Sequence, residues 1–237
     1  ILFSHLLGHL VRGGPDKKAL VIAHRDELTE QNSSKFRLIN PDISVSVIDA
    51  TTKDWSGQVV FAMVQTLARE KNLATLPPVD FIVIDEAHHT PAATYQAIIE
   101  HARELNPECK LIGLTATPSR SDGVGLRQNY SNVADQIFVS ELVGSGHLVI
   151  PRTFVIDVAQ KQLNSVKMLA GDYDMAEVEK ILNKRPINQA VVEKWKELAE
   201  NRKTVVFCST IEHAEGVQQS FLDAGISAEL ITGELTS

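Results

Sequence analysis

The sequence predicts an α/β protein, in which parallel sheets are covered by helices on both faces and the chain forms two lobes. Three observations support this. Most of the predicted strands are apolar runs, with 43–49 alternating; helical segments separate them, and a similar strand–helix–strand pattern starts again late in the chain. Strands of this kind are buried on both faces. The 237 residues, 43% hydrophobic and 22% charged, are enough for one large domain or two smaller ones.

The first lobe is predicted to begin with a helix. Residues 1–12 place apolar side chains at helical spacing, and Gly13-Gly14-Pro15 is expected to end that helix. The predicted strands that follow are ALVIAHR (19–25), ISVSVID (43–49), VVFAMV (59–64), FIVID (81–85) and KLIGLTAT (110–117). Helices are predicted at 26–40 and at about 92–105, so that two of the four connections between successive strands are helical crossovers.

The second half of the chain shows the same signals more sparsely. Residues 121–147 are glycine-rich and indicate loops. The elements predicted after them are a strand at 152–158, a helical stretch at 174–200 broken at Arg185-Pro186, a strand at 203–209, a helix at 211–224 capped by Gly225, and a strand at 228–233. In the strand at 203–209, Phe207 and Cys208 are predicted to lie in the core.

Composition limits the classes of function. The formal net charge is −7, so no bulk positive field attracts nucleic acid, and any such binding must depend on local sites. No apolar run approaches the roughly 20 residues of a membrane span, and no signal peptide is evident. The chain has two widely separated cysteines, Cys109 and Cys208, which favours a reducing, cytoplasmic setting.

The strand FIVI runs directly into Asp85 and Glu86. Ligands of parallel α/β sheets bind beyond the carboxyl ends of the strands, so these acids are placed to hold Mg²⁺ and a nucleotide phosphate. Glu86 would then orient and deprotonate an attacking water. The alternative is that both acids open the next helix, where negative charge is favourable. The two residues alone do not decide between these interpretations.

The surrounding motifs resemble those of the superfamily 2 DEAD/DEAH-box helicases, in the XPB-like and RadD-like branch. IDEAHH (84–89) resembles the Walker B box, and ALVIAHRDELTEQ (19–31) resembles motif Ia. The other matching segments, in the family's order, are VVFAMVQTLAR (59–69), LTATPSR (114–120), GHLVIPR (146–152) and TVVFCSTIEHAEGVQQSFLDAGISAELITG (204–233). Together they extend over nearly the whole chain.

The resemblance implies two RecA-like lobes with ATP and Mg²⁺ as cofactors. It assigns Asp85 to Mg²⁺ and Glu86 to general base catalysis, so that both contact the bound nucleotide. It assigns His88 to a bridge between the Walker B box and LTAT, and Thr115 and Thr117 to coupling of hydrolysis to lobe movement. His88 as an ordinary helix histidine, and the threonines as β-branched residues at a strand end, are the alternatives. His89, one position on, is predicted to be structural or solvent-facing.

The resemblance also implies contacts with one strand of a nucleic acid, with DNA favoured over RNA, and no contact with a membrane. The residues assigned to these contacts are His24, Arg25, Gln65 and Thr66 in the first lobe, and Ser209, Thr210, Thr232 and Gly233 in the second. Arg and hydroxyl donors of this kind contact phosphates without reading sequence. Arg25 has an alternative role in a salt bridge with Asp26 or Glu30. Arg120 is open between a surface charge and a contact with nucleic acid or the second lobe.

The family's Gly-x-Gly-Lys-Thr phosphate loop does not occur in the sequence. The resemblance implies that this loop precedes Ile1 and that the family's motifs V and VI follow Ser237. We therefore expect domain 1–147 to be an ATP-binding domain without its loop, and 148–237 to be the link and the start of the second domain. The 237 residues alone are expected to hydrolyse ATP only at background rate.

The function implied is that of a nucleic-acid-dependent ATPase, a helicase or translocase acting on DNA. One alternative is the motor subunit of a restriction endonuclease. Another, from a different class, is a non-hydrolysing scaffold that binds nucleic acid on a helicase fold.

Overall fold

The computed structural model describes residues 2–49, 51–118, 126–155, 159, 163–169, 172–199 and 201–233. The chain divides into two compact units, Ile1–Leu142 and Val143–Ser237. The division lies near the predicted boundary at 147/148, and the functions assigned to the two domains stay predictions. Each unit is described by itself.

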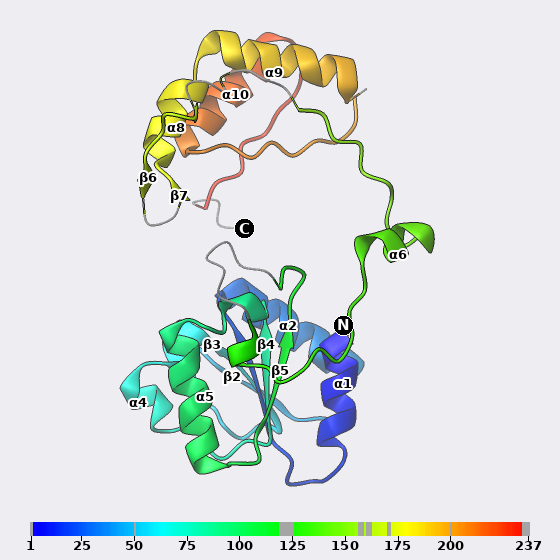
Figure 1. Ribbon diagram of the computed structural model, residues 1–237, viewed down its shortest axis with the longest axis vertical. Helices are drawn as coiled ribbons and strands as arrows, with labels where there is room; N and C mark the ends of the chain where they lie inside the picture. Colours follow the sequence, from blue (N-terminus) through cyan, green and yellow to red (C-terminus); the bar gives the residue numbers. More distant parts are fainter. Residues whose placement is uncertain are drawn as a thin grey trace. The chain divides into compact units, whose positions relative to one another are not determined.

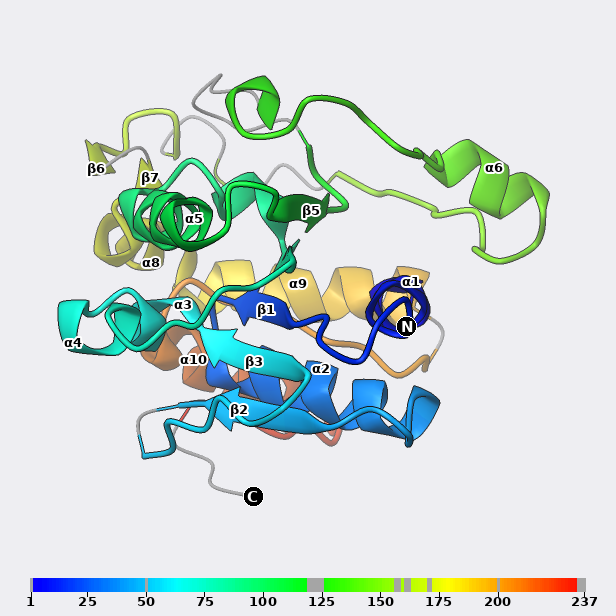
Figure 2. The same ribbon diagram turned by 90° about the horizontal axis from the view of Figure 1, so that it is seen from below.

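Unit 1 contains a five-stranded parallel sheet in the order β2-β3-β1-β4-β5 (Figures 1 and 2). The strands are β1 (Ala19–Ala23), β2 (Val45–Ile48), β3 (Val59–Met63), β4 (Phe81–Asp85) and β5 (Lys110–Leu114). All five lie within the predicted segments, and the parallel α/β class is confirmed. The helices of the unit are α1 (Leu2–Val11), α2 (Asp26–Ile39), α3 (Val64–Leu67), α4 (Glu70–Leu73) and α5 (Ala93–Leu105), with 3-10 turns η1 (Ala87–His89) and η2 (Leu126–Gln128). The short elements α3, α4, η1 and η2 were not predicted.

Different helices cover the two faces of this sheet, as Figure 2 shows. Leu20 and Ile22 of β1 belong to a core that includes residues of α3 and α5. Ala19 and Val21, one position away on the strand, pack with residues of α1 and α2. Successive side chains of a strand point to opposite faces, so a strand covered on both sides must be apolar at every position. The uninterrupted ALVIA run therefore specifies this central strand.

Helix α1 is fixed to the end of α2 by Asn40 and Arg12. Asn40 Nδ2 donates to the Ser4 carbonyl at 3.0 Å, and Asn40 Oδ1 accepts from Arg12 at 3.0 Å. Arg12 also pairs with Asp42 at 2.6 Å, and its side-chain hydrogen bond lowers the pKa of Asp42 to about 2. A Cβ atom at Gly8 would lie 2.1 Å from Asn40 Oδ1, so only glycine permits this close approach of α1.

Unit 2, as far as it is described, consists mainly of helices. They are α8 (Met175–Leu182), α9 (Arg185–Leu198) and α10 (Ile211–Asp223); β6 (Met168–Leu169) and β7 (Asp172–Tyr173) form an antiparallel pair, and α6 (Val139–Gly144) spans the division between the units. Val192 and Trp195 of α9 pack against Val217 and Phe221 of α10, with the Trp195 and Phe221 rings edge to face at 5.6 Å. The predicted break in the helical stretch is confirmed: α8 ends at Leu182 and Pro186 lies in the first turn of α9.

The strands predicted in the second half are wrong wherever the structure describes them. Residues 203–208, 228–233 and 152–155 are irregular, and 156–158 lie outside the described residues. Phe207, predicted to be core, is 93% exposed, and Cys208 is half-buried beside the α9–α10 core. An apolar run shows that a segment suits a sheet, but a strand forms only where a neighbouring strand satisfies its backbone groups. Among the described residues of unit 2, no strand pairs with 203–208.

Within the described parts of the chain, no helix combines the length and the hydropathy that crossing a bilayer requires.

Candidate active site at the carboxyl edge of the sheet

Four adjacent strands deliver polar residues to one edge of the sheet in unit 1. The strands lie in the sheet in the order β3, β1, β4, β5. In the chain, Gln65 comes just after β3, and His24 and Arg25 come just after β1. Asp85 ends β4 and Glu86 comes next, and Thr115 comes after β5. Because the strands are parallel, their carboxyl ends meet at the same edge, where α/β proteins bind ligands. The structure therefore brings together the predicted catalytic residues and the predicted nucleic-acid residues of the first lobe.

Glu86 has a left-handed backbone, with φ 57° and ψ 55°. Among the described residues, only one other non-glycine residue, Asn201, has a positive φ. For a residue with a Cβ atom this conformation costs about 1 kcal/mol or more, and such strain gathers at functional sites. The turn ends β4 and starts η1 at Ala87, and it brings the His89 ring to 4.9 Å from that of His24 at the end of β1. The Glu86 side chain stays 43% exposed and is accessible to water or a ligand.

Asp85 is held by two hydrogen bonds. Its Oδ2 accepts from Asn32 Nδ2 at 2.8 Å, and its Oδ1 accepts from the Glu86 backbone N–H at 3.1 Å. The interpretation of the acids as helix caps is not supported, because Glu86 makes no side-chain cap bond to η1 and the next helix, α5, follows Ala92. Asp85 is thus fixed in place while half-exposed at the carboxyl edge.

His88 lies where the acidic box meets the end of β5. Its Nδ1 is 2.9 Å from Thr115 Oγ1, 3.3 Å from Thr117 Oγ1 and 3.4 Å from Glu86 Oε2. Thr115 Oγ1 also accepts from the Thr117 backbone N–H at 3.1 Å, which shapes the turn after β5. One imidazole nitrogen therefore lies close to the predicted base and to both predicted threonines. Arg120, at the end of the same motif, lies outside the described residues.

Two tyrosines pack close to this edge of the sheet. Tyr130 packs over Gly113 of β5, where an added Cβ would lie 2.5 Å from its ring, and its hydroxyl is 2.9 Å from Thr90 Oγ1. Burial raises the pKa of Tyr130. Burial also raises the pKa of Tyr95 to about 12, with further contributions from Tyr130 and Asp85. Both phenols therefore stay neutral at physiological pH, and neither serves as an acid–base group.

The predicted nucleic-acid residues of unit 1 differ in accessibility. Arg25 and Gln65 are exposed, and His24 is half-buried. Arg25 Nε donates to His24 Nε2 at 3.0 Å; among the ion pairs of the described residues, none joins Arg25 to Asp26 or Glu30. Thr66 is only 2% exposed, so its hydroxyl does not reach a phosphate in this conformation. Gln65 is the available donor of that pair.

The predicted residues of unit 2 lie on two segments. Thr210 caps α10, since its side chain accepts from the His213 N–H at 3.1 Å, and Ser209 Oγ is 3.1 Å from His213 Nδ1. Thr232 and Gly233 lie in irregular chain. The hydroxyl of Thr210 therefore has a structural role, and the nucleic-acid role of all four residues stays a prediction.

Two residues of the site were missed from the sequence. Asn32 lies within a polar run of α2, and nothing in that run distinguishes it from its neighbours. His89 was predicted to be structural or solvent-facing, but its ring lies 4.9 Å from that of His24 and 4.3 Å from that of His88. The histidine two positions before α2 and the doubled histidine after Glu86 were the only signals of this contact.

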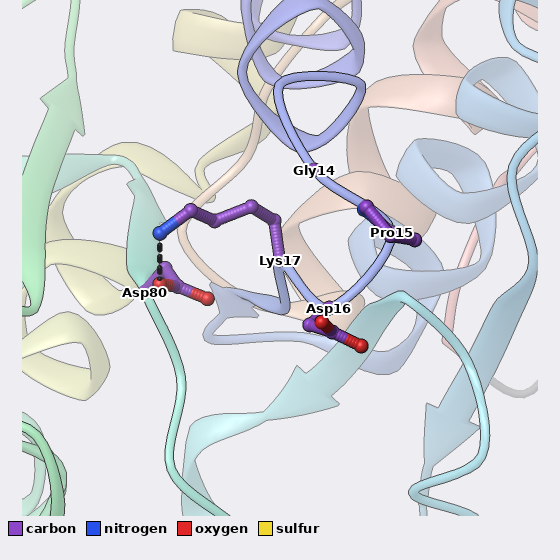
Figure 3. Close-up of a pocket in the computed structure, with 5 residues that line it drawn as sticks. All are labelled: Gly14, Pro15, Asp16, Lys17 and Asp80. Atoms are coloured by element: carbon purple, nitrogen blue, oxygen red, sulfur yellow. Dashed lines mark hydrogen bonds and ion pairs between the residues drawn. The ribbon is translucent and has the colours of Figure 1, made fainter.

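A shallow pocket of about 300 Å³ lies at the opposite, amino-terminal edge of the sheet and is lined by Gly14, Pro15, Asp16, Lys17 and Asp80 (Figure 3). Lys17 pairs there with Asp80 at 2.6 Å, and Asp80 also accepts from the Lys18 N–H at 2.9 Å. The Lys17–Asp80 pair links the segments before β1 and β4, at the edge of the sheet opposite the candidate site, so this pocket does not belong to the site.

The site suits a cation that is bound largely through other ligands. Among the described residues, no group of three or more His, Cys, Asp or Glu side chains converges on a metal position. Asp85 is the carboxylate that two hydrogen bonds hold in place at this edge of the sheet. Mg²⁺ typically uses one or two protein carboxylates and completes its octahedron with waters and phosphates, so a single fixed carboxylate fits it.

The order and geometry of these residues define a superfamily 2 helicase-type domain. The chain belongs to the family described as the res subunit of type III restriction enzymes, which matches residues 1–120. One relative, named an ATP-dependent helicase, IRC3, from Saccharomyces cerevisiae, is 27% identical over 99% of this chain and 36% of its own length. Another, from Schizosaccharomyces pombe and named a mitochondrial ATP-dependent helicase, is 30% identical over 98% of this chain and 39% of its own. The chain thus spans less than half of these relatives.

Among solved structures, the chain is similar to a nuclease-deletion mutant of the type ISP restriction-modification enzyme LlaGI in complex with a DNA substrate mimic. The TM-score is 0.41 at 16% identity, covering 92% of this chain and 22% of that one.

Proposed function

We propose that the protein is a nucleic-acid-dependent ATPase, a motor that couples ATP hydrolysis to movement along DNA. The observation that carries the proposal is the position of His88 Nδ1, within 3.4 Å of Glu86 and within 3.3 Å of Thr115 and Thr117. A base connected in this way to the turn after β5 suits an enzyme in which hydrolysis changes the position of that turn. The family and the helicase names of the two relatives agree with it.

In this proposal residues 85–89 are the Walker B segment of the DEAH type. Asp85, fixed by Asn32, holds Mg²⁺, which when bound neutralises phosphate charge. Glu86 accepts the proton of the attacking water, and its exposed carboxylate is accessible to that water. His88 positions Glu86 and senses the threonines after β5. The nucleotide is ATP, as in the names of the relatives.

The proposed track is DNA, because the family is described by a restriction enzyme subunit. Arg25 and Gln65 are the exposed donors at the edge, and they would contact phosphates without reading sequence. A motor that must release its track uses few such contacts, which agrees with the acidic net charge of −7. Both cysteines are free thiols, which supports a reducing compartment such as the cytoplasm.

A second candidate is the motor subunit of a restriction endonuclease, favoured by the family description. It shares the same site and differs only in what is attached to the motor. The non-hydrolysing scaffold keeps the binding residues but gives no reason for the strained Glu86 backbone.

The nucleic-acid part of the proposal is tested with Arg25→Ala in the complete gene product. We expect the affinity for single-stranded DNA to fall about tenfold, because one charged hydrogen bond to phosphate is lost. The slope of log K against log salt concentration should also become shallower by about 0.7. Fluorescence anisotropy at several salt concentrations measures both.

Arg37→Ala is the matched control, since Arg37 is exposed in the last turn of α2, the helix that begins directly after Arg25. It should leave both the affinity and the salt slope unchanged. Equal affinities for wild type and Arg25→Ala would show that this turn does not contact the track.

A further inference from the structure

We propose that His89 is a positioning residue that couples the polymer-binding turn at Arg25 to the Glu86–His88 centre through its ring contact with His24. The inference rests on the proposed function and assigns a role to a residue that the motif comparison left as structural. The contacts form a continuous series: Arg25 Nε to His24 Nε2 at 3.0 Å, His24 to His89 at 4.9 Å between ring centroids, and His89 to His88 at 4.3 Å.

The sheet topology makes this series possible. β1 and β4 are parallel neighbours with Ile22 opposite Ile84, so the turns after them leave the sheet side by side. The left-handed Glu86 then folds η1 back, and this places His89 against His24 at the end of β1. The left-handed backbone of Glu86 therefore also contributes to the contact between His24 and His89.

In this proposal the Arg25–His24 contact has two states, one without nucleic acid and one with a phosphate bound to Arg25. In this structure Arg25 donates to His24 Nε2, while His24 Nδ1 is buried and, among the described residues, has no hydrogen-bond partner. A phosphate that takes the Arg25 guanidinium removes the bond that holds the imidazole. A buried polar atom without a partner favours rearrangement, so the His24 ring would then reorient. A ligand shifts an equilibrium only through contacts that differ between the states, and the Arg25–His24 bond is such a contact.

The His89 end of the series reaches the reacting groups. His88 is adjacent to His89, and its Nδ1 lies 3.4 Å from Glu86 Oε2 and 2.9 Å from Thr115 Oγ1. A shift of the His89 ring would move the His88 ring that packs on it. A second connection runs through α2, which follows Arg25 and carries Asn32, the donor to Asp85. Polymer bound at Arg25 would thus affect both acids.

The test compares polymer stimulation of ATP hydrolysis, the rate with saturating single-stranded DNA divided by the rate without, in the complete gene product. His89→Ala should lower this ratio by roughly 3- to 30-fold, the range expected for a residue along a coupling network. Because the readout is a ratio, a general loss of activity cancels. His89→Phe keeps a ring and should restore most of the ratio. His101→Ala, at a half-buried histidine of α5, is the control and should keep it.

The outcomes separate the inference from the proposed function. A stimulated wild type with an equally stimulated His89→Ala would overturn the inference alone. A wild type that no polymer stimulates would overturn the proposed function and the inference together. If thermal melting shows that His89→Ala does not fold, His89→Gln, which keeps polar atoms but has no ring, is judged by the same ratio. A His24→Ala/His89→Ala double variant should be no worse than either single one, because both remove the same contact.

Discussion

Replacing Glu86 with glutamine should reduce ATP hydrolysis by the complete gene product about 10²- to 10⁴-fold, the usual contribution of a general base. The amide cannot accept the proton of the attacking water. The carboxylate it replaces is 43% exposed, so the change removes no buried packing. Nucleotide affinity should change little, because Asp85 keeps its hydrogen bonds from Asn32 and from the backbone of residue 86. Steady-state hydrolysis and equilibrium binding of a fluorescent ATP analogue measure the two effects separately.

Glu104→Gln is the matched control, since the Glu104 side chain is 76% exposed on α5 and contacts only His101 among the ion pairs of the described residues. It should hydrolyse ATP at the wild-type rate. If the Glu86→Gln variant kept more than about a tenth of the wild-type rate of ATP hydrolysis, Glu86 would not be the general base.

The largest effect on stability is expected for Phe36→Ala. Phe36 of α2 is fully buried, and its ring meets that of Phe61 of β3 edge to face at 5.7 Å. Truncation removes this contact and leaves a cavity between α2 and the sheet, which should lower the free energy of unfolding of unit 1 by about 3–5 kcal/mol. Denaturant titration of the 237-residue chain, followed by fluorescence, measures it.

Of the two tryptophans in the sequence, Trp55 lies in unit 1 and Trp195 in unit 2, so a Trp195→Phe background makes the fluorescence report on unit 1. Leu38→Ala on the same helix is the control: Leu38 is 83% exposed, and its loss should change the unfolding free energy by less than about 0.5 kcal/mol. Equal losses for Phe36→Ala and Leu38→Ala would contradict the core assigned to α2.

The sheet of unit 1 was predictable chiefly because its central strands are runs of apolar residues. ALVIA and FIVI can be buried on both faces only in the middle of a covered sheet, and β1 and β4 are central neighbours. The segment TVVFC in unit 2 has the same composition, yet Val205 and Phe207 are 74% and 93% exposed in irregular chain. Composition gives the tendency of a segment, whereas strand formation depends on a pairing partner elsewhere, which local sequence does not encode.

The candidate site was predictable to the extent that it follows from strand ends. Asp85, Glu86, Arg25 and Thr115 all lie at or just beyond the carboxyl end of a strand, and parallel strands bring such positions to one edge. The burial of Thr66 could not be predicted because it depends on how α3 packs: its side chain faces the core while Gln65 beside it faces solvent, and its nucleic-acid role stays a prediction. Asn32 and His89 were missed because their contacts cross between elements, and neither the left-handed turn at Glu86 nor the register of α2 is written in local composition.

In the proposed motor, one edge of the sheet carries both the hydrolytic acids and the contacts to a nucleic-acid track. The most direct measurement is the ATP hydrolysis rate of the complete gene product alone and with single-stranded DNA, duplex DNA and RNA. We expect DNA to raise the rate at least tenfold, the change expected for about 1.4 kcal/mol of coupling. A protein that binds DNA but hydrolyses no ATP with any polymer would overturn the proposed motor and leave a scaffold on a helicase fold.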